Sequence, residues 1–312
     1  MNKQNISSVT EFLLLGNIVL EKHPALLFLI CSILYSAILV FNITIITVIL
    51  VDRTLHSPMY LLLFALSVSE TSFTFVTIPK LLAILLTGQH SISFTGCAMQ
   101  MFWFFAFAVN NCFLLVAMAY DRYVAICYPL QYQVLMSKRT CAKLVAASSV
   151  TGFLISLSSD CLIFRLPFCG PNKVKHFFCD ISPVLRLACM DSHLTSIVIT
   201  ILSAMVLLGT VILIIISYIC ILSTILKIHS SAGRQKAFST CASHLTVVVM
   251  HFGGAIFVYL RPKPSLDQDT LISVSYVFLT PLFNPLIYSL RNNEVKLAIK
   301  KLLRNSLHSQ KV

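Results

Sequence analysis

Charged side chains are scarce in this sequence, and acidic ones most of all. Asp, Glu, Lys and Arg make up 11% of the 312 residues, with 11 acidic against 23 basic residues. A water-soluble domain carries roughly a quarter of its residues as charges, whereas here 57% of the residues are hydrophobic and the mean hydropathy is +0.88. This composition excludes an ordinary soluble domain and predicts a membrane protein.

Seven stretches of the sequence are apolar and long enough to cross a bilayer. A membrane-spanning helix needs about 20 such residues, whereas a strand of a membrane barrel needs only about 10. A helix also satisfies its own backbone hydrogen bonds in lipid. The expected spans are 25–50, 58–79, 97–120, 143–164, 194–222, 238–260 and 271–290. The sequence therefore predicts an all-α membrane protein, a seven-transmembrane helix bundle.

The basic residues gather on one side of this bundle. Segments that share a side with the C-terminus hold 14 of the 23 Lys and Arg residues and only three acidic residues. Loops rich in Lys and Arg face the cytoplasm, so we expect the C-terminus inside and the N-terminus outside. The net charge of +12 thus reflects topology, and nucleic-acid binding is not indicated.

The segment after the last span predicts a short amphipathic helix. Val295, Ile299, Leu302 and Leu303 recur at helical spacing beside several Lys and Arg residues, a pattern typical of a helix lying on an anionic membrane surface. The expected organisation is an extracellular N-terminus (1–24), a seven-helix membrane domain (25–290), and a cytoplasmic amphipathic helix and tail (291–312).

The 11 cysteines are odd in number, so at least one is unpaired. Four of them fall on the predicted outer side, where oxidising conditions favour disulfides with three possible connectivities. These four are Cys97, Cys169, Cys179 and Cys189. His176 near Cys179 is compatible with a metal site, but disulfide use of the cysteine is favoured and we expect no metal. Asn5 begins an outer Asn-Ile-Ser sequon and is expected to be glycosylated.

The spans lack the residues that several functional classes require. They contain neither a nucleophile–base pair nor a metal-ligand cluster of the HExxH kind, so we expect no catalytic residues and no enzyme. Glu70 is expected to be the only acid within a span, and no internal repeat is visible, which argues against a channel or transporter.

Several motifs, in order and spacing, resemble those of the rhodopsin-like G-protein-coupled receptors and, within them, the olfactory receptors. Cys97 and Asp121-Arg122-Tyr123 stand at the two ends of the third span. The further motifs are LHSPMYLLL (55–63), MAYDRYVAICYPL (118–130), SY (217–218), KAFSTCASHL (236–245) and PLFNPLIYSLRN (281–292). The resemblance implies a plasma-membrane receptor that binds small volatile odorants. It also implies activation of a stimulatory, olfactory-type heterotrimeric G protein that raises cAMP.

The resemblance implies a switch at the foot of the third span. Asp121 would hold Arg122 at rest, and activation would release the arginine to meet the G protein. Breaking a buried ion pair on one side is costly, which suits a two-state latch. A plain alternative is an arginine that anchors the helix end at the membrane surface. Further residues expected around the same crevice are Tyr123, Tyr218, Lys236, His244 and Tyr288.

Glu70 resembles the family's acid in the second helix, and an ionisable residue inside the membrane is functional by default. It could hold a sodium ion, although Asn111 stands where a second acid often occurs. It could equally be protonated and hydrogen-bonded to Asn111 or Asn284. No other cofactor is expected.

The resemblance places the odorant between the third, fifth and sixth helices, beneath the long outer loop. The residues carried over are Phe104, Phe105, Ala108, Val109, Leu202, Ser203, Val206, Phe252, Ala255, Ile256 and Tyr259. For each of them, helix–helix packing is the plain alternative. Together they predict an apolar pocket with two hydroxyls and no charge, which would bind by burying apolar area at roughly 25 cal/mol per Å².

Three further points follow from the resemblance. An amine receptor would have an acid where this chain has Phe104. An opsin would need a lysine in 271–290, which contains none. The resemblance also pairs Cys97 with Cys179, which leaves Cys169 to pair with Cys189.

Overall fold

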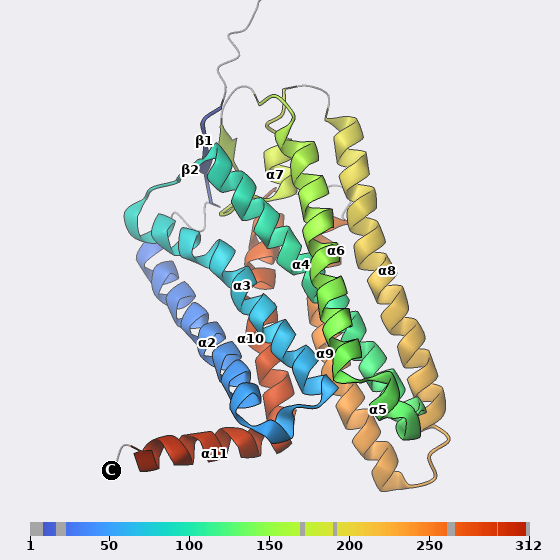
Figure 1. The fold of residues 1–312 in the computed structure, drawn as a ribbon. Coiled ribbons are helices and arrows are strands. Elements are labelled where there is room, and N and C mark those ends of the chain that lie inside the picture. The colour runs from blue at the N-terminus through green and yellow to red at the C-terminus, as the bar shows by residue number, and fades with distance from the viewer. Residues whose placement is uncertain are drawn as a thin grey trace, which may run out of the picture.

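Seven long helices form the bundle in the computed structural model, which describes residues 9–16, 23–168, 172–189, 192–260, 266–291 and 293–309. Within these ranges the long helices run beside one another over most of their length (Figure 1). They are α2 (Pro24–Val51), α3 (Pro58–Thr87), α4 (Phe94–Cys127), α6 (Lys138–Phe164), α8 (His193–Ile225), α9 (Ser231–Tyr259) and α10 (Leu266–Arg291). The predicted seven-helix membrane bundle is confirmed.

Among the described residues, α2, α3, α4, α6, α8 and α9 are each long and apolar enough by themselves to cross a membrane. Helix α10 packs against α2, α3 and α9. Many large apolar side chains, such as Leu26 and Ile33, are exposed on the outside of the bundle. An apolar outer surface of this kind suits lipid as the surrounding solvent.

The ends of the helices follow from local sequence signals. Proline at the first position starts both α2 and α3, where its missing N–H costs no hydrogen bond. Ser137 accepts a hydrogen bond from the Thr140 amide and so caps α6. Gly88 ends α3 in the left-handed conformation, with φ of 68°, which glycine adopts without steric penalty.

Polar side chains from neighbouring helices satisfy carbonyls next to prolines. Pro285 cannot donate to the carbonyl of Pro281, one turn earlier in α10, and Asn42 of α2 donates to that oxygen at 2.9 Å. Gln100 of α4 donates to the carbonyl of Val76, three residues before Pro79 in α3, at 2.9 Å. These bonds fix how α2 meets α10 and how α4 meets α3.

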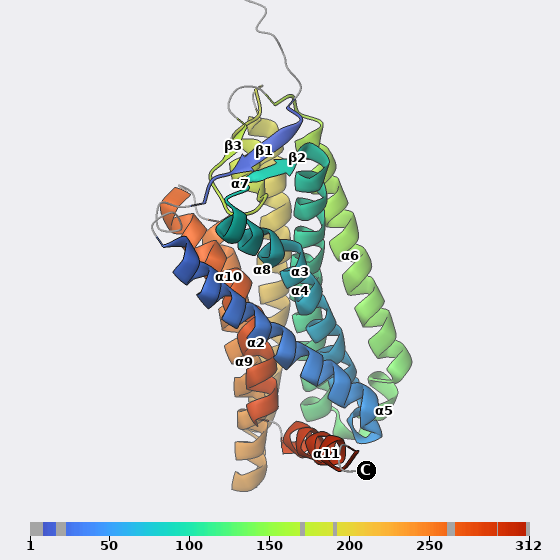
Figure 2. The same ribbon diagram turned by 90° about the vertical axis from the view of Figure 1, so that its left-hand side faces the viewer.

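A small sheet covers one end of the bundle, called here the sheet end (Figure 2). Strand β1 (Glu11–Leu14) pairs with β2 (Ser91–Ser93) in antiparallel fashion and with β3 (Lys173–Val174) in parallel. Phe12 and Leu14 are fully buried in a separate apolar cluster beneath it. The N-terminal strand was not predicted from the sequence.

The loop between α6 and α8 is tied to this end by a disulfide. Cys97, in the first turn of α4, is bonded to Cys179, which confirms the pairing that the resemblance implied. Cys189 is also disulfide-bonded. Its expected partner, Cys169, and the expected glycosylation site, Asn5, lie outside the described residues. The loop also contains the short helix α7 (Ile181–Leu185).

The opposite end of the bundle, the α11 end, carries the helix α11 (Asn293–Ser309), which lies across it (Figures 1 and 2). Val295 and Ala298 are buried, whereas Lys296 and Lys300 are exposed. Lys301 is 3.3 Å from Asp52. The short elements here are η1 (Arg53–Leu55), η2 (Pro129–Gln131) and α5 (Tyr132–Leu135).

Candidate ligand-binding site

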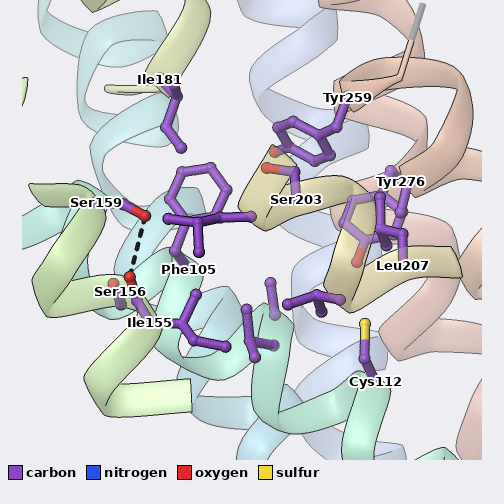
Figure 3. A pocket seen from close by; sticks show the side chains of 15 residues that line it. Phe105, Cys112, Ile155, Ser156, Ser159, Ile181, Ser203, Leu207, Tyr259 and Tyr276 are labelled. Atoms are coloured by element: carbon purple, nitrogen blue, oxygen red, sulfur yellow. Dashed lines mark hydrogen bonds between the residues drawn. The ribbon is translucent and has the colours of Figure 1, made fainter. Parts of the chain in front are cut away.

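A mostly apolar cavity lies among α4, α6, α8, α9 and α10, beneath α7 (Figure 3). The empty space among its side chains is about 560 Å³, including the part open to the surroundings. Small-molecule sites are concave and are lined mainly by apolar groups. The lining residues are Phe105, Ala108, Val109, Cys112, Ile155, Ser156, Ser159, Ile181, Leu202, Ser203, Val206, Leu207, Ala255, Tyr259 and Tyr276.

Eight of the eleven residues expected at the ligand site line this one cavity. They are Phe105, Ala108, Val109, Leu202, Ser203, Val206, Ala255 and Tyr259. The other three do not line it. Phe104 is 1% exposed, with its ring centroid 4.8 Å from that of Phe73 and 4.6 Å from that of Phe178. Phe252 is buried, and Ile256 packs against the main core.

Sequence reasoning missed the contributions of α6, α7 and α10. The missed lining residues are Cys112, Ile155, Ser156, Ser159, Ile181, Leu207 and Tyr276. One signal was present in α6, where Ser148, Gly152, Ser156 and Ser159 recur at intervals of three or four residues and are all buried. Small residues at that spacing mark a face where two membrane helices pack closely, so this face could have been assigned to the interior.

Four polar side chains of the lining are engaged by protein groups. The Ser156 hydroxyl donates to the Phe102 carbonyl at 2.5 Å, and the Ser159 hydroxyl donates to the Ile155 carbonyl at 3.0 Å. The Cys112 thiol is hydrogen-bonded to Nε2 of His251 at 3.4 Å. The Tyr259 hydroxyl interacts with the Asp180 carboxylate.

The α6–α8 loop closes the cavity at the sheet end through a buried polar contact. The Cys179 amide donates to Oε1 of Gln100 at 3.0 Å, while the other end of the Gln100 amide group holds α3. His176 is buried in this loop, and its Nδ1 accepts a hydrogen bond from the Phe178 amide. Burial lowers the pKa of His176 from 6.5 to about 3, because the charged imidazolium would lose its hydration.

The residues expected to form the switch meet near the α11 end. Arg122 is 5% exposed and lies within electrostatic range of Tyr218, His244 and Tyr288. The neighbouring Asp121 accepts a hydrogen bond from the Tyr132 hydroxyl of α5 at 2.8 Å. The structure therefore brings four of the predicted residues around one arginine.

His244 joins three helices in this region. Its Nε2 is 3.1 Å from the Leu115 carbonyl of α4, and its Nδ1 is 2.9 Å from the Tyr218 hydroxyl of α8. Tyr123 makes a different contact from the residues around Arg122. Its hydroxyl donates to that of Tyr128 at 3.4 Å. The side chain of Lys236 lies outside the described part of the structure.

Glu70 is 1% exposed and accepts a hydrogen bond from the side-chain amide of Asn284. Asn111 is also buried, and the side-chain oxygens of both asparagines have no hydrogen-bond partner among the described residues. Glu70 is not the only acid within a helical span, however, since α6 continues to Phe164 and includes Asp160. The expectation that it stood alone was wrong, because Asp160 also lies within the expected span 143–164.

Comparisons with known proteins show which family this chain belongs to. The family model described as olfactory receptor matches residues 30–306. Human olfactory receptor 10R2 is 53% identical over 96% of this chain and 90% of its own length. Human olfactory receptor 10K1 is 51% identical over 99% of both chains, and mouse olfactory receptor 10J5 is 48% identical over 96% of this chain and 97% of its own. The chain therefore belongs to the olfactory receptor family, a family of multi-pass membrane receptors that are not enzymes.

Proposed function

We propose that this receptor binds small, neutral, mostly apolar volatile molecules in the cavity of Figure 3 and activates a stimulatory, olfactory-type G protein that raises cAMP. The observation that carries the proposal is the cavity itself. Its 15 lining residues include no Asp, Glu, Lys, Arg or His. Burying a charged ligand without a partner charge is costly, so amines, carboxylates and peptides fit this lining poorly.

The binding energy would come mainly from apolar contact. Aromatic and aliphatic side chains such as Phe105, Val109 and Leu202 would surround a hydrocarbon body, and each Å² that they bury contributes roughly 25 cal/mol. One or two hydrogen bonds would then set the ligand's orientation. A molecule of this kind partitions readily into both air and lipid.

The proposed topology puts the sheet end outside the plasma membrane and the α11 end in the cytoplasm. The support is the excess of Lys and Arg in the segments at the α11 end. This orientation presents Arg122 to a cytoplasmic G protein and places the α6–α8 loop in the oxidising environment where the Cys97–Cys179 disulfide forms.

The contacts of His244 support a two-state mechanism at Arg122. His244 holds α4, α8 and α9 together, and Tyr132 holds Asp121. Separation of α9 from α4 would break the contacts of His244 with Leu115 and Tyr218. The Tyr218 hydroxyl could then interact with Arg122 instead. Ligand binding would favour this open arrangement only by the difference in its affinity for the two states.

We also propose that Glu70 is neutral in the resting receptor. The Asn284 amide donates a hydrogen bond to one carboxyl oxygen of Glu70. This bond competes with a cation for the same oxygen. A protonated Glu70 could donate to one of the buried amide oxygens, which otherwise have no partner among the described residues. A sodium ion bound by Glu70, Asn111 and Asn284 oxygens is the other outcome, and sodium-dependent ligand affinity that Glu70→Gln abolishes would establish it.

The test of function is a panel of neutral volatiles applied to cells that express the receptor. We expect dose-dependent cAMP production that disappears when the stimulatory G protein is deleted and returns when it is restored. Arg122→Ala at equal surface expression is the matched control, since it should bind ligand but give a lower maximal response. A ligand-evoked current that persists without any G protein would contradict the proposal and indicate a channel.

A further inference from the structure

We propose that the Tyr276 phenol is the polar anchor of the cavity, so that the receptor recognises volatiles with a hydrogen-bond-accepting oxygen, such as ketones, esters and ethers. The inference rests on the proposed function, because it takes the cavity as the ligand site. It assigns a role to a residue of α10 that lies outside the three helices expected to hold the ligand.

The first step is an account of every polar side chain that lines the cavity. Six of the 15 lining residues carry a polar group. Four of these groups, those of Cys112, Ser156, Ser159 and Tyr259, are engaged by protein partners. Among the described residues, no hydrogen bond is made by the hydroxyls of Ser203 or Tyr276.

Ser203 has another way to satisfy its hydroxyl. A serine inside a helix can donate to the carbonyl four residues earlier, and four residues of the same helix, α8, already do so. They are Thr200, Thr210, Ser217 and Thr224, which donate to Ser196, Val206, Leu213 and Cys220. A rotation of its side chain would let Ser203 do the same, so this residue does not depend on the cavity's contents.

Tyr276 has no such alternative, because its hydroxyl lies at the far end of a rigid ring and cannot reach its own backbone. Figure 3 shows the hydroxyl directed toward the part of the cavity that Cys112 borders. The residue is 8% exposed, and none of the described residues is hydrogen-bonded to its hydroxyl, so an occupant of the cavity can complete that bond. A buried hydroxyl left without a partner is costly.

The ring of Tyr276 is held from three sides. Its centroid is 5.6 Å from that of His251 and 6.0 Å from that of Phe73. On the side of α9, a Cβ added to Gly254 would come within 3.0 Å of Cδ2 of the ring. These contacts orient the phenol before any ligand enters, which reduces the entropy cost of the hydrogen bond.

The chemistry of the group defines the ligand class. A phenol can donate a hydrogen bond to a carbonyl or ether oxygen. A hydrocarbon of the same shape would fill the same volume but leave the phenol unpaired. The neutral hydrogen bond should therefore favour the oxygenated ligand by about two- to tenfold.

The experiment uses matched pairs of volatiles. Each pair consists of a methyl ketone and the alkene in which a methylene group replaces the carbonyl oxygen, so that shape is kept and the acceptor is lost. Potency is measured for wild type, Tyr276→Phe, Ser203→Ala and Tyr259→Phe, all normalised to surface receptor. We expect the ketone to be more potent in wild type, and Tyr276→Phe to lower the ketone's potency by about two- to tenfold without changing that of the alkene.

The control variants show whether the effect belongs to this hydroxyl. Ser203→Ala and Tyr259→Phe each remove one hydroxyl from the same cavity, and both should leave the ketone-to-alkene ratio near its wild-type value. A selective loss in Tyr259→Phe, with none in Tyr276→Phe, would overturn the inference. So would equal losses for both members of each pair in Tyr276→Phe.

Two further comparisons distinguish loss of the anchor from a folding defect and from failure of the proposed function. Tyr276→Phe keeps the ring contacts, and Gly254→Ala, which displaces the ring, should reduce the same ratio while Tyr276 remains present. An unchanged ratio in Gly254→Ala would count against the phenol as an oriented anchor. A wild-type receptor that reaches the surface but answers no neutral volatile would refute the proposed function itself, whereas a normal response with an unchanged ratio in Tyr276→Phe refutes only the anchor.

Discussion

Asp121 and Arg122 are adjacent in sequence, yet the structure gives them different surroundings. Asp121 accepts a hydrogen bond from Tyr132, whereas Arg122 lies among Tyr218, His244 and Tyr288 of three other helices. The acid is thus held by the segment just after α4, and the arginine faces the helices that would have to move. The latch, in which the acid restrains the arginine until α9 separates, stays a prediction.

The latch predicts opposite effects for the two residues. Asp121→Asn should raise ligand-free cAMP, because it removes the negative charge that restrains Arg122, while Arg122→Ala should lower the maximal response. Tyr132→Phe removes only the hydroxyl that holds Asp121 and should give a smaller rise. Basal cAMP is measured at matched surface expression, and equal values for Asp121→Asn and wild type would argue against the latch.

His176 predicts how the stability of the α6–α8 loop depends on pH. Its pKa is about 3 when buried and 6.5 when exposed, so between these values the unfolded loop binds more protons than the folded one. The contribution of neutral His176 to the stability of this loop is therefore fully present above about pH 6.5. It falls as the pH drops, and about 2 kcal/mol is lost at roughly pH 5. The unfolding temperature of purified receptor should fall accordingly.

A substitution separates this effect from general acid denaturation. His176→Asn keeps an acceptor for the Phe178 amide but does not titrate, so its unfolding temperature should change less between neutral pH and about pH 5. His23→Asn, at an exposed position before α2, should behave like wild type. If His176→Asn and wild type lose the same stability on acidification, His176 is not the group responsible.

At the scale of helices, packing between α4 and α6 sets the width of the cavity. Gly152 of α6 lies against the backbone of α4, and a Cβ added to it would stand 2.5 Å from the Ala106 carbonyl oxygen. Ser156 and Ser159, one and two turns further along α6, reach the cavity from the same face. The close approach at glycine is therefore what brings α6 into the ligand site.

This contact predicts a specific cost for a single methyl group. Gly152→Ala should force α4 and α6 apart and destabilise the receptor by about 1–3 kcal/mol, seen as a lower unfolding temperature and a changed order of ligand potency. Gly209→Ala is the matched control, because nothing lies within 4 Å of a Cβ built there. It should be neutral or slightly stabilising, and equal losses in the two variants would contradict a packing role for Gly152.

At the scale of the whole molecule, segments far apart in sequence close the sheet end together. Strand β1 of the N-terminus pairs with β2, which precedes α4, and with β3 of the α6–α8 loop. The Cys97–Cys179 bond joins residues 82 positions apart in the same region. Phe12 and Leu14 bury their side chains between these segments, so the loop above the cavity is held from two directions.

This arrangement predicts that the long-range disulfide matters most. Cys179→Ser should destabilise the receptor by about 2–4 kcal/mol and lower ligand potency, because the loop loses its tie to α4. Cys189→Ser should have a smaller effect, since the expected bond between Cys189 and Cys169 closes only a short loop. Cys161→Ser, at an exposed free cysteine, is the control, and a receptor that tolerates Cys179→Ser as well as Cys161→Ser would contradict the prediction.

The sequence by itself determined the number of spans, their approximate limits and the amphipathic helix α11. These features depend on local properties, namely the length and polarity of each segment measured against the thickness of a bilayer. The motifs added the identity of the disulfide partners and the residues around Arg122. Each of these inferences needs only the order of residues along the chain.

Only the tertiary structure decided which face of each helix meets the cavity. A rotation of α4 by part of a turn would put Phe104 in the cavity in place of Phe105. In the structure, Phe104 packs against Phe73. The entry of α6 and of Tyr276 into the cavity depends on close contacts at Gly152 and Gly254. The pairing of β1 depends on segments distant in sequence. Such features arise from packing between helices, and a span that is apolar on every side does not encode them locally.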